Sequence, residues 1–142
     1  IVAVIMLFLL VFYLRSPQKE SVKSYEVNSF IQSFLHYTTG CEEDYFGGMS
    51  VQDLIFECDS NALCVDGRNS CDALNSTLKD MVEKSWQVGQ DRPVKGYELK
   101  ITSDSGELIS FMEGNITGSY KGGLQNFAKS GESVNITFRA YY

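Results

Sequence analysis

The sequence predicts an α+β fold: a long amino-terminal helix over 1–38, then a small globular head over 39–142 with two helices and an antiparallel sheet of about three strands. Three observations lead to this prediction. Residues 1–14 are continuously apolar and residues 20–37 are amphipathic. The middle of the chain carries apolar side chains at helical spacing, and residues 97–140 contain segments that alternate with a period of two.

The first fourteen residues contain no polar group except the hydroxyl of Tyr13. As a helix they would span about 21 Å, less than the roughly 30 Å hydrocarbon core of a bilayer. Three interpretations are open: part of a membrane anchor, a helix that packs against copies of itself in a filament, or a buried core helix. The last is the least favoured, because a core helix normally keeps one polar face. The candidate polymerisation residues are Ile1, Val2, Val4, Ile5, Leu7, Phe8, Leu9, Val11, Phe12 and Leu14.

A second, amphipathic part of the same helix is expected from Glu20 to Tyr37, after a kink or break near Pro17. Its polar residues are interspersed with an apolar stripe that is expected to lie on the head. The stripe consists of Val27, Phe30, Ile31, Phe34 and Leu35. Gly40 suits the left-handed position that ends many helices, so the helix is predicted to stop at about residue 38.

The head is predicted to begin with two helices. Ser50 is expected to cap a short helix, and Ser70 to cap a longer helix over 71–86. The longer helix carries an apolar stripe of Leu74, Leu78, Val82 and Trp86, which is typical of core packing.

Strands follow the two helices. Tyr97–Ile101, Glu107–Phe111 and Val134–Ala140 alternate between apolar and polar residues, as half-buried strands do. Residues 113–131 are rich in Gly and Asn and are predicted to be mostly loop.

Four cysteines, Cys41, Cys58, Cys64 and Cys71, lie within 31 residues. An even number of cysteines behind an apolar segment favours two disulfides and an oxidising exterior. Zinc binding is disfavoured because the cysteines lack the close paired spacing of zinc ribbons. The sequence leaves all three pairings open, with a slight preference for the most local one, Cys41–Cys58 with Cys64–Cys71.

Three N-x-Ser/Thr sequons also favour an exterior location and N-glycosylation. They begin at Asn75, Asn115 and Asn135. The alternation of the last strand places Asn135 on an outward-facing position. Asn75 is the least favoured acceptor, because it lies next to the apolar stripe of its helix.

No catalytic residue, metal site or cofactor is predicted. The chain has none of the common nucleotide-binding, hydrolase or zinc-protease motifs, and its lone histidine, His36, is expected at the surface. Eighteen acidic residues against twelve basic ones give a net charge of −6, so nucleic-acid binding is not expected. The sequence therefore indicates a structural or binding protein rather than an enzyme.

An apolar amino-terminal segment that continues amphipathically into a small disulfide-bearing head resembles the type IV pilin superfamily. Bacterial members typically carry Phe at the first mature position and Glu at the fifth, where this chain has Ile1 and Ile5. The absence of the acidic residue, together with the sequons, looks more like the archaeal branch. The resemblance covers residues 1–38 and implies an extracellular helical polymer whose subunits are membrane-anchored before assembly.

The leading expectation is thus a pilin-like subunit of a cell-surface filament, a homopolymer held together by its apolar end. The alternative is a membrane-anchored adhesion module that does not polymerise and binds surface glycans or a partner protein. Its expected ligand surface is a set of aromatic residues: Tyr45, Phe46, Tyr120, Tyr141 and Tyr142.

Overall fold

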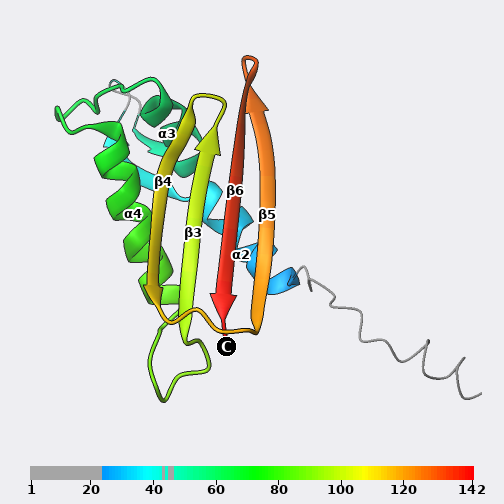
Figure 1. The fold of residues 1–142 in the computed structure, drawn as a ribbon. Helices are drawn as coiled ribbons and strands as arrows, with labels where there is room; N and C mark the ends of the chain where they lie inside the picture. Colours follow the sequence, from blue (N-terminus) through cyan, green and yellow to red (C-terminus); the bar gives the residue numbers. More distant parts are fainter. Residues whose placement is uncertain (1–23, 43, 45–46) are drawn as a thin grey trace, which may run out of the picture.

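The computed structural model describes residues 24–42, 44 and 47–142 (Figure 1). The helices in this part of the chain are α2 (Tyr25–Leu35), α3 (Val51–Asp59) and α4 (Ser70–Ser85). The strands are β1 (Thr38–Glu42), β2 (Gly48–Ser50), β3 (Gly96–Ser103), β4 (Gly106–Gly114), β5 (Tyr120–Lys129) and β6 (Glu132–Tyr141). The predictions for the apolar segment 1–14 and for the break near Pro17 lie outside the described residues.

A four-stranded antiparallel sheet with the strand order β4-β3-β6-β5 is the centre of the domain. Two hairpins form its halves, and β3 pairs with β6 to join them. In the β5–β6 hairpin, Ser130 and Gly131 have φ angles of 53° and 91°. Positive φ at both central positions is what a type I′ turn requires, and this turn matches the twist of the strands. A second sheet pairs β1 with β2.

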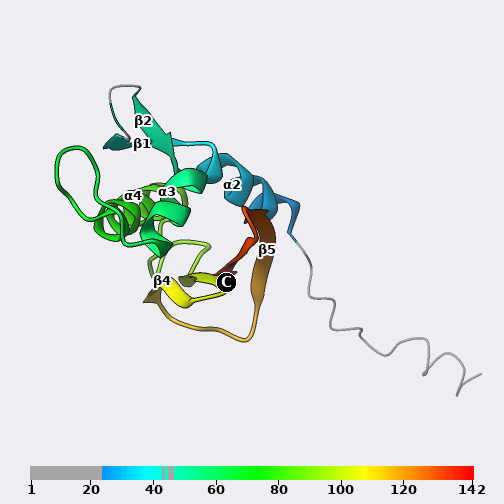
Figure 2. The same cartoon turned by 90° about the horizontal axis from the view of Figure 1, so that it is seen from above.

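All three helices lie on one side of the large sheet, as Figure 2 shows from above. The covered face carries the buried side chains of alternate residues, and the opposite face, which we call the open face, carries the residues between them. In β3, for example, Leu99 and Ile101 are fully buried, whereas Lys100 is exposed. None of the helices that the structure describes is long and apolar enough to cross a bilayer.

The ring of Phe138, on the covered face of β6, joins the helices to the sheet. Its centroid lies 5.4 Å from that of Phe30 in α2, 5.3 Å from that of Trp86 at the end of α4, and 6.2 Å from that of Tyr97 in β3. Aromatic pairs at these separations add about 0.5–1.5 kcal/mol each beyond the area they bury. This cluster makes α2, α4 and the sheet share one core.

Helix α2 packs closely on β5, and a glycine makes this possible. Val27 and Ile31 of α2 are fully buried. A Cβ atom on Gly123 would lie 2.7 Å from Val27 Cγ1 and 3.0 Å from Ile31 Cδ1, closer than carbon atoms approach. At the neighbouring Gly122, a Cβ atom would have its nearest contact at 3.4 Å, on the Tyr120 ring. Gly123 is therefore needed for contact with the helix, whereas Gly122 is not.

The predicted organisation of the fold is wrong. The structure shows no long helix in the residues it describes: α2 ends at Leu35, and the chain then enters β1 rather than continuing to about residue 38. The reason is tertiary, since β1 pairs with β2 and the Thr39 hydroxyl donates a hydrogen bond to the Met49 carbonyl oxygen at 2.9 Å. The described residues form three short helices and two sheets, instead of one long helix followed by two helices and about three strands.

The strand β5 lies within the segment that was predicted to be mostly loop. Glycine and asparagine have low strand propensity, so the sequence pattern favoured a loop. Pairing with β6 along the whole of β5 and the close approach of α2 at Gly123 override that local preference. The cap of α4 also differs from the prediction: the Asn69 side chain accepts from the Cys71 amide, while Ser70 is buried.

Other elements lie where the sequence predicted them. α3 begins after Ser50, whose side chain accepts from the Asp53 amide, and three strands cover the alternating segments of β3, β4 and β6. The predicted stripe of α2 is buried at Val27, Ile31, Phe34 and Leu35.

The close α2–β5 contact leads to a testable pair of variants. Gly123→Ala should destabilise the protein by about 1–3 kcal/mol, because the new methyl group forces α2 away from the sheet. Gly122→Ala should change stability by less than about 0.5 kcal/mol, since its methyl group meets only ordinary contacts. Chemical denaturation of the two full-length variants measures both effects. Equal stability of the two variants would contradict the packing described here.

Candidate functional site

The chain enters the described domain at one edge of the large sheet. The Ser24 amide donates to the Gly122 carbonyl oxygen of β5 at 3.2 Å, and Glu26 lies 3.5 Å from the Lys121 ammonium group. The candidate polymerisation residues Ile1, Val2, Val4, Ile5, Leu7, Phe8, Leu9, Val11, Phe12 and Leu14 lie outside the described residues. The first residue that the structure describes, Ser24, lies beside β5.

Two disulfides cross-link the helical side of the domain. Cys41 in β1 bonds to Cys64 in the α3–α4 loop, and Cys58 near the end of α3 bonds to Cys71 in the first turn of α4. Two disulfides were predicted, but the preferred local pairing is wrong. The packing of α3 on α4 brings the adjacent ends of these helices together, and sequence spacing does not reveal this. Closing loops of 23 and 13 residues stabilises the fold by about 3 kcal/mol per bond in the chain-entropy model.

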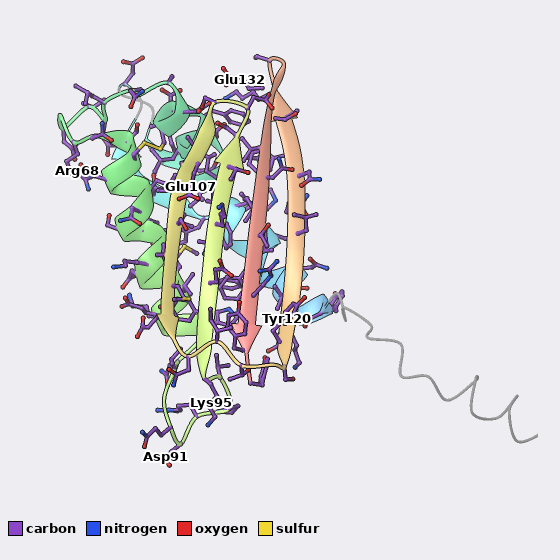
Figure 3. All side chains as sticks on the ribbon, viewed as in Figure 1. Arg68, Asp91, Lys95, Glu107, Tyr120 and Glu132 are labelled. Atoms are coloured by element: carbon purple, nitrogen blue, oxygen red, sulfur yellow. A yellow bond between two sulfur atoms is a disulfide. The ribbon has the colours of Figure 1, made fainter. Side chains whose placement is uncertain are left out.

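The cross-linked α3–α4 loop exposes two apolar side chains. Leu63 is 67% exposed and Val65 is 59% exposed, on either side of the buried Cys64. The loop is also held by main-chain bonds, since the Val65 amide donates to the Glu42 carbonyl oxygen at 3.1 Å. Arg68, labelled in Figure 3, reaches back to the Gly40 carbonyl oxygen at 2.9 Å. The disulfide therefore keeps a small apolar tip in a defined position.

All three sequon asparagines are exposed. Asn75 lies on the outer side of α4, Asn115 follows β4, and Asn135 lies on the open face of β6 between the buried Val134 and Ile136. The outward position predicted for Asn135 agrees with its exposure. Exposure of Asn75 removes the reason for disfavouring it, because the apolar stripe lies on the other side of the helix. Glycosylation stays a prediction at each position.

The open face carries a network of polar and aromatic groups near the carboxyl end of β6. The Tyr141 hydroxyl donates to Glu98 Oε2 at 3.1 Å, and the Arg139 guanidinium lies 3.5 Å from the same oxygen. Partial burial, followed by the Glu98 hydrogen bond, raises the pKa of Tyr141 above its ordinary value. Arg139 also lies 5.6 Å from the ring centroid of Tyr120. These groups hold one another in place on the open face.

The predicted aromatic patch is only partly present on this surface. Tyr45 and Phe46 lie outside the described residues, and Tyr141 is 4% exposed. Tyr120 is exposed and lies at the β5 edge of the sheet (Figure 3).

A shallow cavity of about 420 Å³ lies between the end of α4 and the sheet. Trp86, Tyr97, Arg92 and Glu113 are among its lining residues. The Tyr97 hydroxyl donates to Glu113 Oε2 at 2.6 Å, and burial raises the pKa of this hydroxyl well above its ordinary value. Tyr97 therefore stays neutral and cannot act as a base near neutral pH. The Trp86 indole nitrogen is buried without a hydrogen-bond partner among the described residues.

His36 and Asp59 lie in other parts of the domain. His36 is exposed, as predicted. Asp59 accepts a hydrogen bond from the Ser103 hydroxyl at 2.8 Å and another from the Ser105 hydroxyl, so it ties α3 to the β3–β4 turn. Within residues 24–42, 44 and 47–142, no three histidine, cysteine or acidic side chains are placed to hold a metal ion.

No protein-family model matches this chain, and neither a curated protein nor a solved structure matches it.

The disulfide connectivity is directly testable. Cleavage at acidic residues separates the four cysteines, because Glu57 and Asp59 flank Cys58 and Asp66 separates Cys64 from Cys71. Mass spectrometry of the unreduced digest should identify linked peptides containing Cys41 with Cys64 and Cys58 with Cys71. A Cys41–Cys58 peptide would contradict the arrangement of β1, α3 and α4 described above.

Proposed function

We propose that this chain is a structural subunit of an extracellular filament, similar to type IV pilins, whose copies associate through the apolar segment 1–14. The observation that carries the proposal is the segregation of the sequence: fourteen residues with one polar group adjoin a chain of ordinary soluble composition. Such a segment is stable only in lipid or among other apolar surfaces. It serves as a membrane anchor before assembly and as the contact between copies afterwards.

Burial of the apolar side chains of residues 1–14 contributes a large favourable free energy. Burying an Ile, Leu, Phe or Val side chain stabilises by about 1.5–3 kcal/mol relative to exposing it. Residues 1–14 contain eleven such side chains, ten of which are the candidate polymerisation residues. The cost of ordering the chain offsets much of this free energy.

The described domain supports an exterior role for the rest of the chain. Two disulfides suit an oxidising environment, and the three sequon asparagines are exposed. The net charge of −6 favours solubility and disfavours non-specific clustering of filaments. Ile1 and Ile5, which resemble the archaeal branch, favour an assembly that does not use the acidic residue of bacterial pilins.

Acidic substitutions in the apolar segment test this proposal. Ile5→Asp or Leu9→Asp should reduce filament yield at least 100-fold, since an aspartate in an apolar environment costs on the order of 3 kcal/mol per copy. Leu63→Asp is the matched control, because it replaces an exposed apolar residue in the described domain. Electron microscopy and quantitative blotting of sheared cell-surface material measure the filaments.

Two outcomes would overturn the filament proposal. One is a normal filament yield from the Ile5→Asp chain. The other is wild-type material that is dispersed in the membrane fraction without filaments, which would support the adhesion module instead.

A further inference from the structure

The three sequon asparagines are all exposed, but they lie on different kinds of main chain. Asn75 lies within α4 and Asn135 within β6, whereas Asn115 follows the last residue of β4 and lies in no regular element. The sequons at Asn115 and Asn135 consist of the same three residue types, Asn-Ile-Thr, so the motif itself does not distinguish them. Glycosylated asparagines typically lie in surface loops, where an enzyme can reach the main chain of the sequon as well as its side chain. Access to the main chain therefore decides among the three.

The main chain at Asn135 is held on both sides. β6 pairs with β3 and with β5, and Asn135 lies opposite Thr102 in the first and Asn126 in the second. Its neighbours Val134 and Ile136 are fully buried on the covered face. Freeing this segment requires β6 to separate from the sheet, and core strands open with a free energy close to that of global unfolding. The Asn135 sequon is therefore closed to an enzyme once the domain has folded.

The sequon at Asn75 is held by the helix that contains it. The Thr77 hydroxyl donates to the Ala73 carbonyl oxygen at 2.8 Å, and the adjacent Leu74 and Leu78 are fully buried. A disulfide also joins the first turn of α4 to α3. Presenting this sequon to an enzyme requires α4 to unwind beside core residues.

The sequon at Asn115 lies in the connection between β4 and β5. This connection crosses the end of the large sheet, because the two strands form its outer edges (Figure 1). The Asn115 amide donates to the Lys95 carbonyl oxygen at 2.8 Å. Beyond it, Ile116 is 63% exposed, and no main-chain hydrogen bond joins residues 116–118 to another described residue. The main chain of this sequon is therefore accessible without the opening of a helix or a strand.

A hollow of about 390 Å³ lies beside the same sequon, and both Asn115 and Thr117 line it, together with Val88. Its volume is within the range of about 300–1,000 Å³ that small-molecule sites occupy, so a sugar joined to the Asn115 side chain has room there. The Thr117 hydroxyl lies 2.8 Å from the carbonyl oxygens of Ser119 and Tyr142. Rotation of this one side chain releases the hydroxyl for recognition by an enzyme.

We propose that Asn115 is the asparagine that is N-glycosylated on the folded domain, whereas Asn75 and Asn135 are modified only before the fold forms. In the transfer, the Asn115 amide nitrogen forms a bond to the anomeric carbon of an oligosaccharide carried by a lipid diphosphate. The bond between that carbon and the diphosphate oxygen breaks, the lipid diphosphate leaves, and the amide nitrogen loses one proton to a base of the transferase. The exterior location of the reaction rests on the proposed function, but the choice of Asn115 rests on the described domain alone.

Transfer to the purified protein tests this choice. The full-length chain, with its disulfides intact, is incubated in detergent with an oligosaccharyltransferase that accepts N-x-Ser/Thr and with a lipid-linked oligosaccharide. Mass spectrometry of the digest should show an occupancy of Asn115 at least about tenfold above that of Asn75 or Asn135, because only the latter two need an element to open. After reduction and alkylation in denaturant, followed by dilution, the occupancies of Asn115 and Asn135 should agree within about threefold, because their sequons are identical.

A matched pair of variants assigns the modified residue independently. Asn115→Gln and Asn135→Gln each replace an exposed asparagine by a longer amide that is not an acceptor. Asn115→Gln should reduce the total transfer to the folded protein at least about tenfold, whereas Asn135→Gln should leave it unchanged. Both variants should accept sugar after reduction and alkylation, which separates closure by the fold from a general loss of acceptor activity.

The two proposals fail in different ways. Equal occupancy of Asn115 and Asn135 on the folded protein, or transfer to Asn115 only after unfolding, would overturn this inference. Either result would leave the filament proposal intact, because neither measurement involves assembly. Selective transfer to Asn115, on a protein whose native material forms no filaments, would support this inference and contradict the filament proposal.

Discussion

Burial of one face of the four-stranded sheet is the constraint on which the rest of the domain depends. Phe138 lies at the centre of that face and contacts aromatic rings from α2, from the end of α4 and from β3. The positions of α2 and of the end of α4 follow from this face, and α3 packs on α4. Gly123 then sets how closely α2 approaches β5, and with it the place where the chain enters the domain.

The same constraint determines which surfaces are left for function. With the helices on one side, no helix covers the open face (Figures 1 and 2), whereas the β5 edge is bonded to Ser24 at Gly122. The open face is occupied by groups that satisfy one another, such as Glu98 with Arg139 and Tyr141. The charges of the edge strands are paired within the domain, as in Lys121 with Glu26 and Glu107 with Lys100.

Local patterns predicted much of the domain, and tertiary contacts decided the remainder. The strands β3 and β6 and the helix α4 were predicted from the sequence. Burial of one face of each element spaces its apolar residues at a regular period. The strand β5 was not predicted from the sequence, because Gly122 and Gly123 have low strand propensity. At Gly123 the glycine is required by α2, which is distant in sequence. The exposed apolar residues of the edges were missed for a related reason: Leu124 was assigned to a loop, and an exposed Met112 has no distinguishing pattern.

The sequence by itself determined the division between an apolar end and an acidic, cysteine-bearing remainder, because composition requires no knowledge of packing. It also determined the number of cysteines and sequons, and hence the preference for an exterior role. Only the tertiary structure decided that Cys41 bonds to Cys64 and Cys58 to Cys71, since these pairings depend on how β1, α3 and α4 meet. It also decided which strands form the edges. The order β4-β3-β6-β5 arises from pairing between distant segments, which local periodicity does not encode.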